Sequence, residues 1–226
     1  MQTLINEDDR DRTQRTTNLR LGYETFPGQQ YFLQLKWDRR VYEKSDRVIN
    51  VKRSSEGESA LLGMTFDLNG LVFGEWSAGY LRQDYQDPFP DINKPLFGAS
   101  LNWNVTRLST VKFIVQREIG ETTSSRFSGY TSTSTLLGVE HELRRHVLVD
   151  ISLNYTSDDF QGIGAAERED KTYDFYIGPT YLINRYFRLS AAYHRLKRDS
   201  SGNTSAPGVV DDYLKNIVLI QFQAQL

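Results

Sequence analysis

Alternation with a period of two residues dominates this chain from Thr16 to Leu226. About ten alternating apolar and polar residues lead into a tight turn, a second alternating run follows, and a long polar loop ends the unit. Because successive side chains of a β-strand point to opposite faces, the pattern predicts strands with one apolar and one polar face. In the last run, Leu214, Val218, Ile220, Phe222 and Ala224 share one parity, and Lys215, Gln221, Gln223 and Gln225 share the other.

The alternating runs predict about eleven antiparallel strands joined in an up-and-down order. Their expected spans are 16–26, 30–42, 59–68, 71–85, 96–105, 108–119, 131–143, 147–159, 171–182, 187–198 and 212–226. Tight turns are expected at Pro27-Gly28, Asn69-Gly70, Thr106-Arg107, Arg144-Arg145 and Asn184-Arg185. The remaining connections, 43–58, 86–95, 120–130, 160–170 and 199–211, are long and polar. Short turns alternating strictly with long loops are typical of transmembrane barrels, whose short turns face the periplasm.

The polar face of the expected strands holds too many charged residues to form a dry core. Such residues can line a wet lumen and pair across neighbouring strands. The expected lumen-lining residues are Arg20, Lys36, Asp38, Arg40, Glu75, Lys112, Glu118, Glu140, Asp150, Asp174, Arg188 and His194. We therefore predict an all-β fold, a transmembrane antiparallel up-and-down β-barrel with 11 to 12 visible strands, formed by a single domain over 16–226.

Parity alone does not distinguish an inward from an outward face, so a soluble sandwich or a lipocalin-like barrel remains open. The alternating loop lengths, aromatic residues near the strand ends and a terminal strand closing on Leu226 favour the membrane barrel. No run approaches the roughly twenty apolar residues of a membrane helix. The net charge of -2 provides no basic field for nucleic acid, and the absence of Cys excludes thiolate chemistry.

The first fifteen residues are expected to form a polar outer loop or a truncated N-terminal segment. Met1 leads directly into the charged run 6–12, with no signal peptide. Counting back from a periplasmic C-terminus, eleven strands place 1–15 outside the cell, whereas bacterial single-chain barrels have even strand numbers. The count favours a fragment of a larger barrel over a twelve-strand barrel that uses 1–5 as a strand remnant.

Four arginines have the apolar parity, namely Arg39, Arg82, Arg117 and Arg195. An arginine at the bilayer midplane would cost about 2 to 4 kcal/mol. All four lie about nine or ten residues beyond a tight turn, which places them at the outer rim. They are candidates for contact with outer-membrane lipid, specifically lipopolysaccharide phosphates, since the guanidinium binds phosphate in a bidentate manner. Strand ends that simply enter water are the alternative.

Catalytic chemistry has little support in the sequence. Of three histidines, only His194 has lumen parity, and Ser190 lies too far along the same strand to bond it directly. Glu140, Glu142 and Asp150 could bind Ca²⁺ or act in acid/base chemistry, although pairing with Lys112 and Arg188 is the simpler interpretation. We expect no catalytic residues, no metal site and no cofactor.

From about Gly79 onward the chain resembles a family of β-barrel porins associated with exopolysaccharide biosynthesis loci in Proteobacteria. The resembling pieces are Gly79-Tyr80, Gln83-Asp84-Tyr85, Trp103-Asn104-Val105-Thr106, Arg117-Glu118-Ile119-Gly120-Glu121-Thr122, Glu140-His141-Glu142-Leu143, Arg168-Glu169-Asp170, Tyr181-Leu182-Ile183-Asn184-Arg185 and Asp212-Tyr213-Leu214-Lys215-Asn216. The resemblance implies a location in the bacterial outer membrane, longer relatives with upstream strands, and a link to polysaccharide export machinery.

The expected function is therefore a porin-like channel or export conduit rather than an enzyme. A non-conducting structural or adhesive barrel, whose long loops bind a surface partner, is the alternative.

Overall fold

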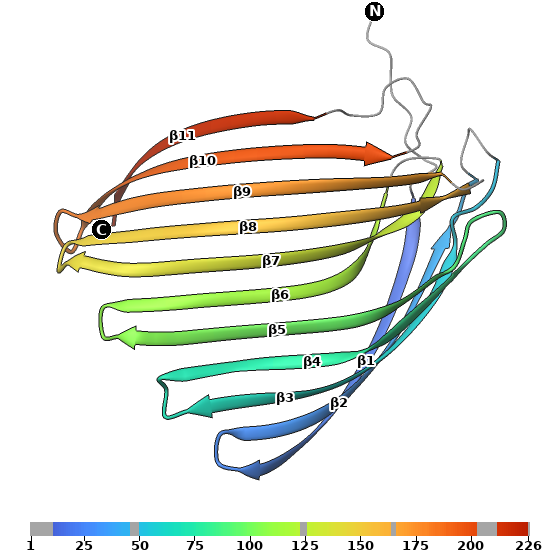
Figure 1. Ribbon diagram of the computed structural model, residues 1–226, viewed down its shortest axis with the longest axis horizontal. Coiled ribbons are helices and arrows are strands. Elements are labelled where there is room, and N and C mark those ends of the chain that lie inside the picture. Colours follow the sequence, from blue (N-terminus) through green and yellow to red (C-terminus); the bar gives the residue numbers. More distant parts are fainter. Residues whose placement is uncertain (1–10, 46–49, 123–125, 164–165, 203–211, 226) are drawn as a thin grey trace, which may run out of the picture.

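Eleven antiparallel strands form one sheet in the computed structural model, which describes residues 11–45, 50–122, 126–163, 166–202 and 212–225. Each strand pairs with its sequence neighbour, in the order β1 to β11 (Figure 1). The strands are β1 Arg12–Phe26, β2 Gln29–Tyr42, β3 Ser55–Leu68, β4 Val72–Tyr85, β5 Ile92–Thr106, β6 Ser109–Glu121, β7 Phe127–Arg144, β8 Val147–Gly162, β9 Glu167–Leu182, β10 Phe187–Gly202 and β11 Tyr213–Ala224. The all-β, up-and-down architecture predicted from the alternation is confirmed.

The strands extend further toward the long loops than the apolar alternation does. β3 begins at Ser55 rather than residue 59, and β9 begins at Glu167 rather than residue 171. Likewise, β1 begins at Arg12, inside the segment expected to be a loop, while residues 1–10 lie outside the described part of the chain. Backbone pairing continues wherever neighbouring strands stay side by side, even where both faces are polar, so the hydrophobic pattern underestimates strand length.

The tight turns lie where Gly and Asn predicted them. Asn69 and Gly70 both have positive φ, 56° and 67°, which is the signature of a type I′ hairpin turn. The Asp67 carboxylate accepts a hydrogen bond of 2.6 Å from the Gly70 N–H. In the last tight turn the Asn184 side chain accepts bonds from the N–H groups of Tyr186 and Phe187. Figure 1 shows all the short turns at one end of the sheet and the longer connections at the other.

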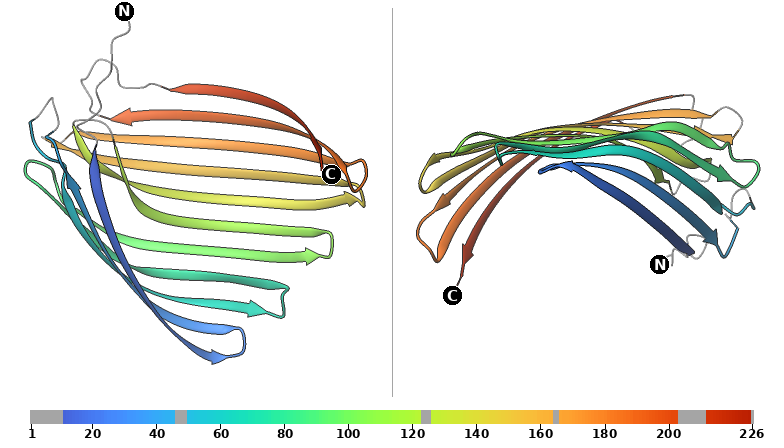
Figure 2. Two further views of the ribbon diagram at one scale, coloured as in Figure 1. Left: turned by 180° about the vertical axis from the view of Figure 1, so that it is seen from behind. Right: turned by 90° about the horizontal axis from the view of Figure 1, so that it is seen from below.

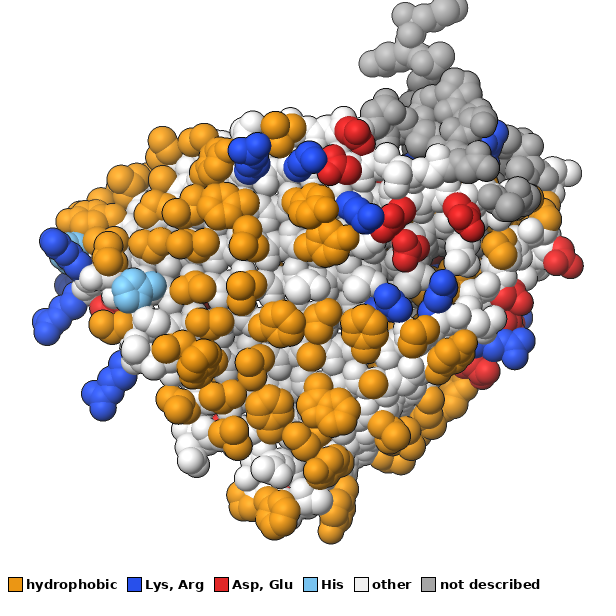
Figure 3. Space-filling model, viewed as in Figure 1, with side chains coloured by type: hydrophobic (Ala, Val, Ile, Leu, Met, Phe, Trp, Pro, Cys, Tyr) orange, Lys and Arg blue, Asp and Glu red, His pale blue; other side chains and the backbone are white. Residues whose placement is uncertain are grey.

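The sheet is strongly arched, so it has a convex and a concave face (Figure 2). β1 passes behind the central strands in Figure 1 and in front of them in the reverse view, so the face seen in Figures 1 and 3 is the convex one. Figure 3 shows that face covered by hydrophobic side chains over its middle, with charges of both signs toward the long-loop end and basic side chains at the short turns. Leu62, Leu153 and Ile220 are among the exposed apolar residues there.

The charged parity lies on the concave face. Arg20 of β1 bonds Glu75 of β4, and Arg12 of β1 bonds Glu121 of β6. Side chains from strands that are not neighbours can meet only across the inside of the arch. A soluble sandwich or lipocalin-like barrel would bury its apolar parity there, so both alternatives are excluded, and the sheet has the inside-out polarity of a membrane barrel.

The arch is not closed by pairing between the first and last strands. Among the described residues, β1 pairs only with β2, and β11 pairs only with β10. The described part of the chain also contains no helix that is long and apolar enough to cross a bilayer.

Candidate functional site

A buried network of charges occupies the long-loop end of the concave face. Arg40 forms ion pairs with Asp38 and Glu121, in which its Nε lies 2.6 Å from an Asp38 carboxylate oxygen and its Nη1 lies 2.9 Å from a Glu121 carboxylate oxygen. The Tyr42 hydroxyl donates to the same Glu121 carboxylate at 2.8 Å, and Arg12 adds a further contact. The Asp38 and Arg40 side chains are at most 10% exposed, so both charges depend on this network for compensation.

Local strand geometry explains the network. Asp38, Arg40 and Tyr42 alternate along β2, which places all three on the concave face. Their cross-strand partners in β1 continue the set, because Gln14 and Thr16 both donate to the Asp38 carboxylate, at 2.8 and 2.6 Å. Here the arch brings β1 and β2 against the end of β6, so a polar bridge crosses the concave face at its long-loop end.

A second cluster on the same face joins β9 and β10. Asp170 is fully buried and is held by Arg168 at 2.7 Å and by Arg198. Arg168 also lies over the ring of Phe160, 5.3 Å from its centroid, and Phe160 packs against Tyr130. The cluster therefore combines two guanidinium groups, one carboxylate and an aromatic surface.

Toward the short turns the concave charges are paired but more exposed. Arg20 bonds Glu75 at 2.8 Å and stacks on Phe32, with its guanidinium carbon 3.5 Å from the ring centroid. Lys112 bonds Glu140 across neighbouring strands. Asp150 is the cross-strand partner of Glu140, so a second carboxyl group lies beside this ion pair. These pairs form an aqueous wall of mixed charge rather than a field of one sign.

Gly63 lies opposite Phe32 in the β2–β3 ladder and makes room for the Phe32 ring in this wall. A Cβ added at Gly63 would lie 2.2 Å from the Phe32 ring and 2.5 Å from the Trp76 carbonyl oxygen. The absence of a side chain at Gly63 lets Phe32 lie flat across β3 and become almost completely buried. Arg20 then uses the ring as its support.

The histidines form no complete catalytic arrangement within the described residues. The His194 ring packs edge-on against Tyr176 and lies 3.5 Å from the Asp174 carboxylate, but neither contact supplies a nucleophile. His141 Nδ1 is 2.8 Å from Ser109 Oγ on the convex face, with no carboxylate bonded to the imidazole. The described part of the chain also holds no group of three His, Asp or Glu side chains placed to bind a metal ion.

The other residues expected to line the lumen fall on the concave face as well. Lys36 and Glu118 border a hollow of about 210 Å³ together with Gln34 and Gln83. Arg188 shares the face of His194 and is exposed near a short turn. The structure thus brings Arg20 to Glu75, Lys112 to Glu140, Asp38 to Arg40 and Asp174 to His194, while Arg188 and Glu118 have no bonded partner among the described residues.

The four rim arginines occupy the convex face but differ in surroundings. Arg39 bonds Glu56 at 3.1 Å, and Arg82 bonds Asp84 at 2.7 Å. Arg117 donates to Thr133 at 2.9 Å and lies over Phe97. In the described part of the chain, Arg195 forms no ion pair. Three further basic residues have the same parity but were not predicted to lie on this face, namely Arg15, Lys171 and Lys197.

The two charged clusters contain five residues that were not among the predicted lumen-lining residues, namely Arg12, Glu121, Arg168, Asp170 and Arg198. Asp170 and Arg198 have concave parity, and extending the period of two beyond the apolar runs would have found them. Glu121 is different, because it is the last residue of β6, where alternation no longer predicts its direction.

A family model agrees with this architecture. The family model described as "Putative beta-barrel porin 2" matches residues 2–226. No curated protein matches the chain significantly in sequence. Among solved structures, the crystal structure of a Pseudomonas aeruginosa FadL homologue is similar, with 11% identity and a TM-score of 0.31 over 81% of this chain and 70% of that one. Because the family model spans almost the whole sequence, the chain belongs to this family of β-barrel porins.

Proposed function

We propose that the protein acts in the bacterial outer membrane as a porin-like channel or export conduit. The observation that carries the proposal is the inside-out sheet, whose convex face is apolar and whose concave face holds paired charges. Only a barrel surrounded by lipid and filled with water satisfies both faces. Membership of the porin family supports the same function.

The proposed cargo is exopolysaccharide or its fragments. Amides and hydroxyls such as Asn102, Ser152 and Thr172 share the concave face with the ion pairs. Groups of this kind offer sugar hydroxyls weak bonds that exchange readily, and a conduit needs binding that is favourable enough to admit its cargo and weak enough to release it. The resemblance to porins of exopolysaccharide loci also supports this cargo and a partner in the export machinery.

Planar lipid bilayers test the channel. The purified, heat-modifiable protein should produce stable conductance steps, and Glu75→Gln should shift the cation-to-anion permeability ratio toward anions by roughly two-fold, because one lumen carboxylate is lost. Glu56→Gln is the matched control, since Glu56 lies on the convex face and should leave the ratio unchanged. A folded barrel that never conducts would refute the channel.

One observation favours a second function, a non-conducting structural or adhesive barrel. The contacts of Arg12 and Arg40 with Glu121 cross the concave face, and Arg53 adds a bond of 2.7 Å to the Thr122 carbonyl. Such a bridge would narrow the outer mouth. If Glu121→Ala converts a silent protein into a conducting one, the bridge closes the pore, and the adhesive function becomes the better description.

A further inference from the structure

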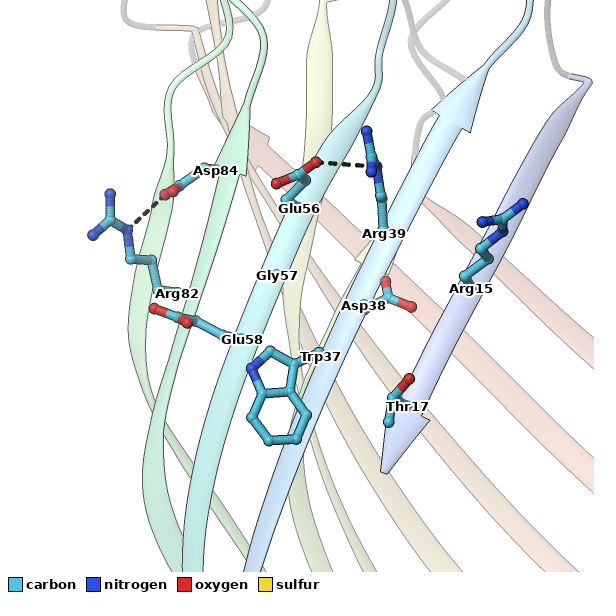
Figure 4. Close-up of a pocket in the computed structure, with 10 residues that line it drawn as sticks. All are labelled: Arg15, Thr17, Trp37, Asp38, Arg39, Glu56, Gly57, Glu58, Arg82 and Asp84. Atoms are coloured by element: carbon cyan, nitrogen blue, oxygen red, sulfur yellow. Dashed lines mark hydrogen bonds and ion pairs between the residues drawn. The ribbon is translucent and has the colours of Figure 1, made fainter. Parts of the chain in front are cut away.

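An open groove of about 420 Å³ lies on the convex face over β1 to β4, near their long-loop ends. Figure 4 shows its charged lining, with Arg15, Arg39, Glu56 and Asp84 in one row across the four strands and Glu58 beside Arg82 in the next. All six have the parity of the apolar side chains, so they project outward from the arch and not toward the concave face.

Two like charges of the groove lie on neighbouring strands. Arg15 and Arg39 are directly opposite each other in the β1–β2 ladder. Like charges in that position destabilise a sheet. Arg15 forms no ion pair or hydrogen bond with any described residue, and the contact of Arg39 with Glu56 uses Nε. The Nη groups of both arginines are therefore available to a shared anion.

The groove also lies at a defined depth. Trp37 borders it, and two residues further along β2 toward the short turn the apolar side chains Leu35 and Leu33 begin. Tryptophan is typical of the boundary between hydrocarbon and headgroups. The two arginines lie on the polar side of that boundary, where the phosphates of a lipid headgroup are found.

We propose that Arg15 and Arg39 form a clamp for a phosphate on the headgroup of an outer-leaflet glycolipid, whose acyl chains cover the apolar band below Trp37. A phosphate between the two guanidinium groups removes their repulsion and accepts bidentate bonds from each. The proposal rests on the outer-membrane location proposed above, but not on conduction. Arg82 is less available, because Asp84 already pairs with it.

Native mass spectrometry of the detergent-purified barrel tests the clamp. The probes are bisphosphorylated lipid A, the same lipid with both phosphates removed, and inorganic phosphate. The wild type should bind the bisphosphorylated lipid at least ten-fold more tightly than the dephosphorylated one, and millimolar inorganic phosphate should not displace it. Arg15→Gln with Arg39→Gln should lose that ten-fold preference. The control, Arg144→Gln with Arg145→Gln, removes two exposed arginines at a short turn and should keep the preference.

Equal binding of the two lipids, displacement by inorganic phosphate, or equal loss in the control would each overturn the clamp. If the double variant does not show heat-modifiable folding, the single variant Arg15→Gln is used to test the clamp. It relieves the like-charge contact, so it should fold at least as well as the wild type and still bind the phosphorylated lipid several-fold less. Conductance measured on the same samples separates this outcome from the channel, because loss of lipid binding should leave conductance unchanged.

Discussion

Arg39 and Arg40 are consecutive residues of β2, yet the ion pair of Arg39 is exposed to solvent and those of Arg40 are buried. The Arg40 side chain is 10% exposed between Asp38 and Glu121, whereas Arg39 is 66% exposed beside Glu56. The distances are similar, 2.6 Å to Asp38 and 3.1 Å to Glu56. Burial, not geometry, decides what each contact contributes, because a buried charge that loses its partner has no water to replace it. The buried ion pairs of Arg40 therefore help to hold the arch in shape, whereas the exposed Arg39 side chain stays available to ligands.

The largest effect should follow from Arg40→Ala. The substitution leaves the Asp38 and Glu121 carboxylates without their central cation, and breaking a buried pair in this way typically costs about 3 to 5 kcal/mol. Urea unfolding in lipid vesicles, followed by the fluorescence of Trp37, Trp76 and Trp103, measures the change in the free energy of unfolding. A loss smaller than about 1 kcal/mol would show that water reaches the cluster and that the two faces are less different than we infer.

The neighbouring leucines of β3 provide the second test. Leu62 is exposed on the convex face, and Leu61 lies on the concave face opposite Gln34. Leu62→Arg should reduce the free energy of unfolding by about 2 to 4 kcal/mol, since it places a charge in hydrocarbon. Leu61→Arg places the new charge among the polar groups of the concave face, so it should reduce the free energy of unfolding clearly less in the same vesicle assay. The reverse order would mean that the concave face is the lipid-facing one.

The smallest effect should come from Arg39→Ala. An exposed ion pair contributes about 0 to 1 kcal/mol, so unfolding in urea should change within that range. A double-mutant cycle with Glu56→Ala isolates the pair, and its coupling energy should fall as salt is raised. Coupling that persists at high salt would place this pair in a drier environment than its exposure indicates.

Alternation predicted much of this molecule but not its curvature. The eleven strands, the Asn69-Gly70 turn and the face of residues such as Arg20 and Glu75 follow from local rules that each strand obeys alone. The contact between Arg20 and Glu75 does not, because it joins β1 to β4 and depends on how far the sheet bends. Arg15 was missed for a different reason, since its strand begins before the apolar residues do.

The polar bridge at the long-loop end of the concave face bears on the order of folding. Every ladder in the sheet joins strands that are adjacent in sequence, so hairpins can form and add to one another without closing long loops. The contact between Arg12 and Glu121 lies outside these ladders, because it connects residues 109 positions apart. Its loop can close only after β1 to β6 have assembled and bent. We therefore expect this contact to form late in folding. A spectroscopic probe on Arg12 or Glu121 would detect the formation of the native curvature rather than the pairing of the strands.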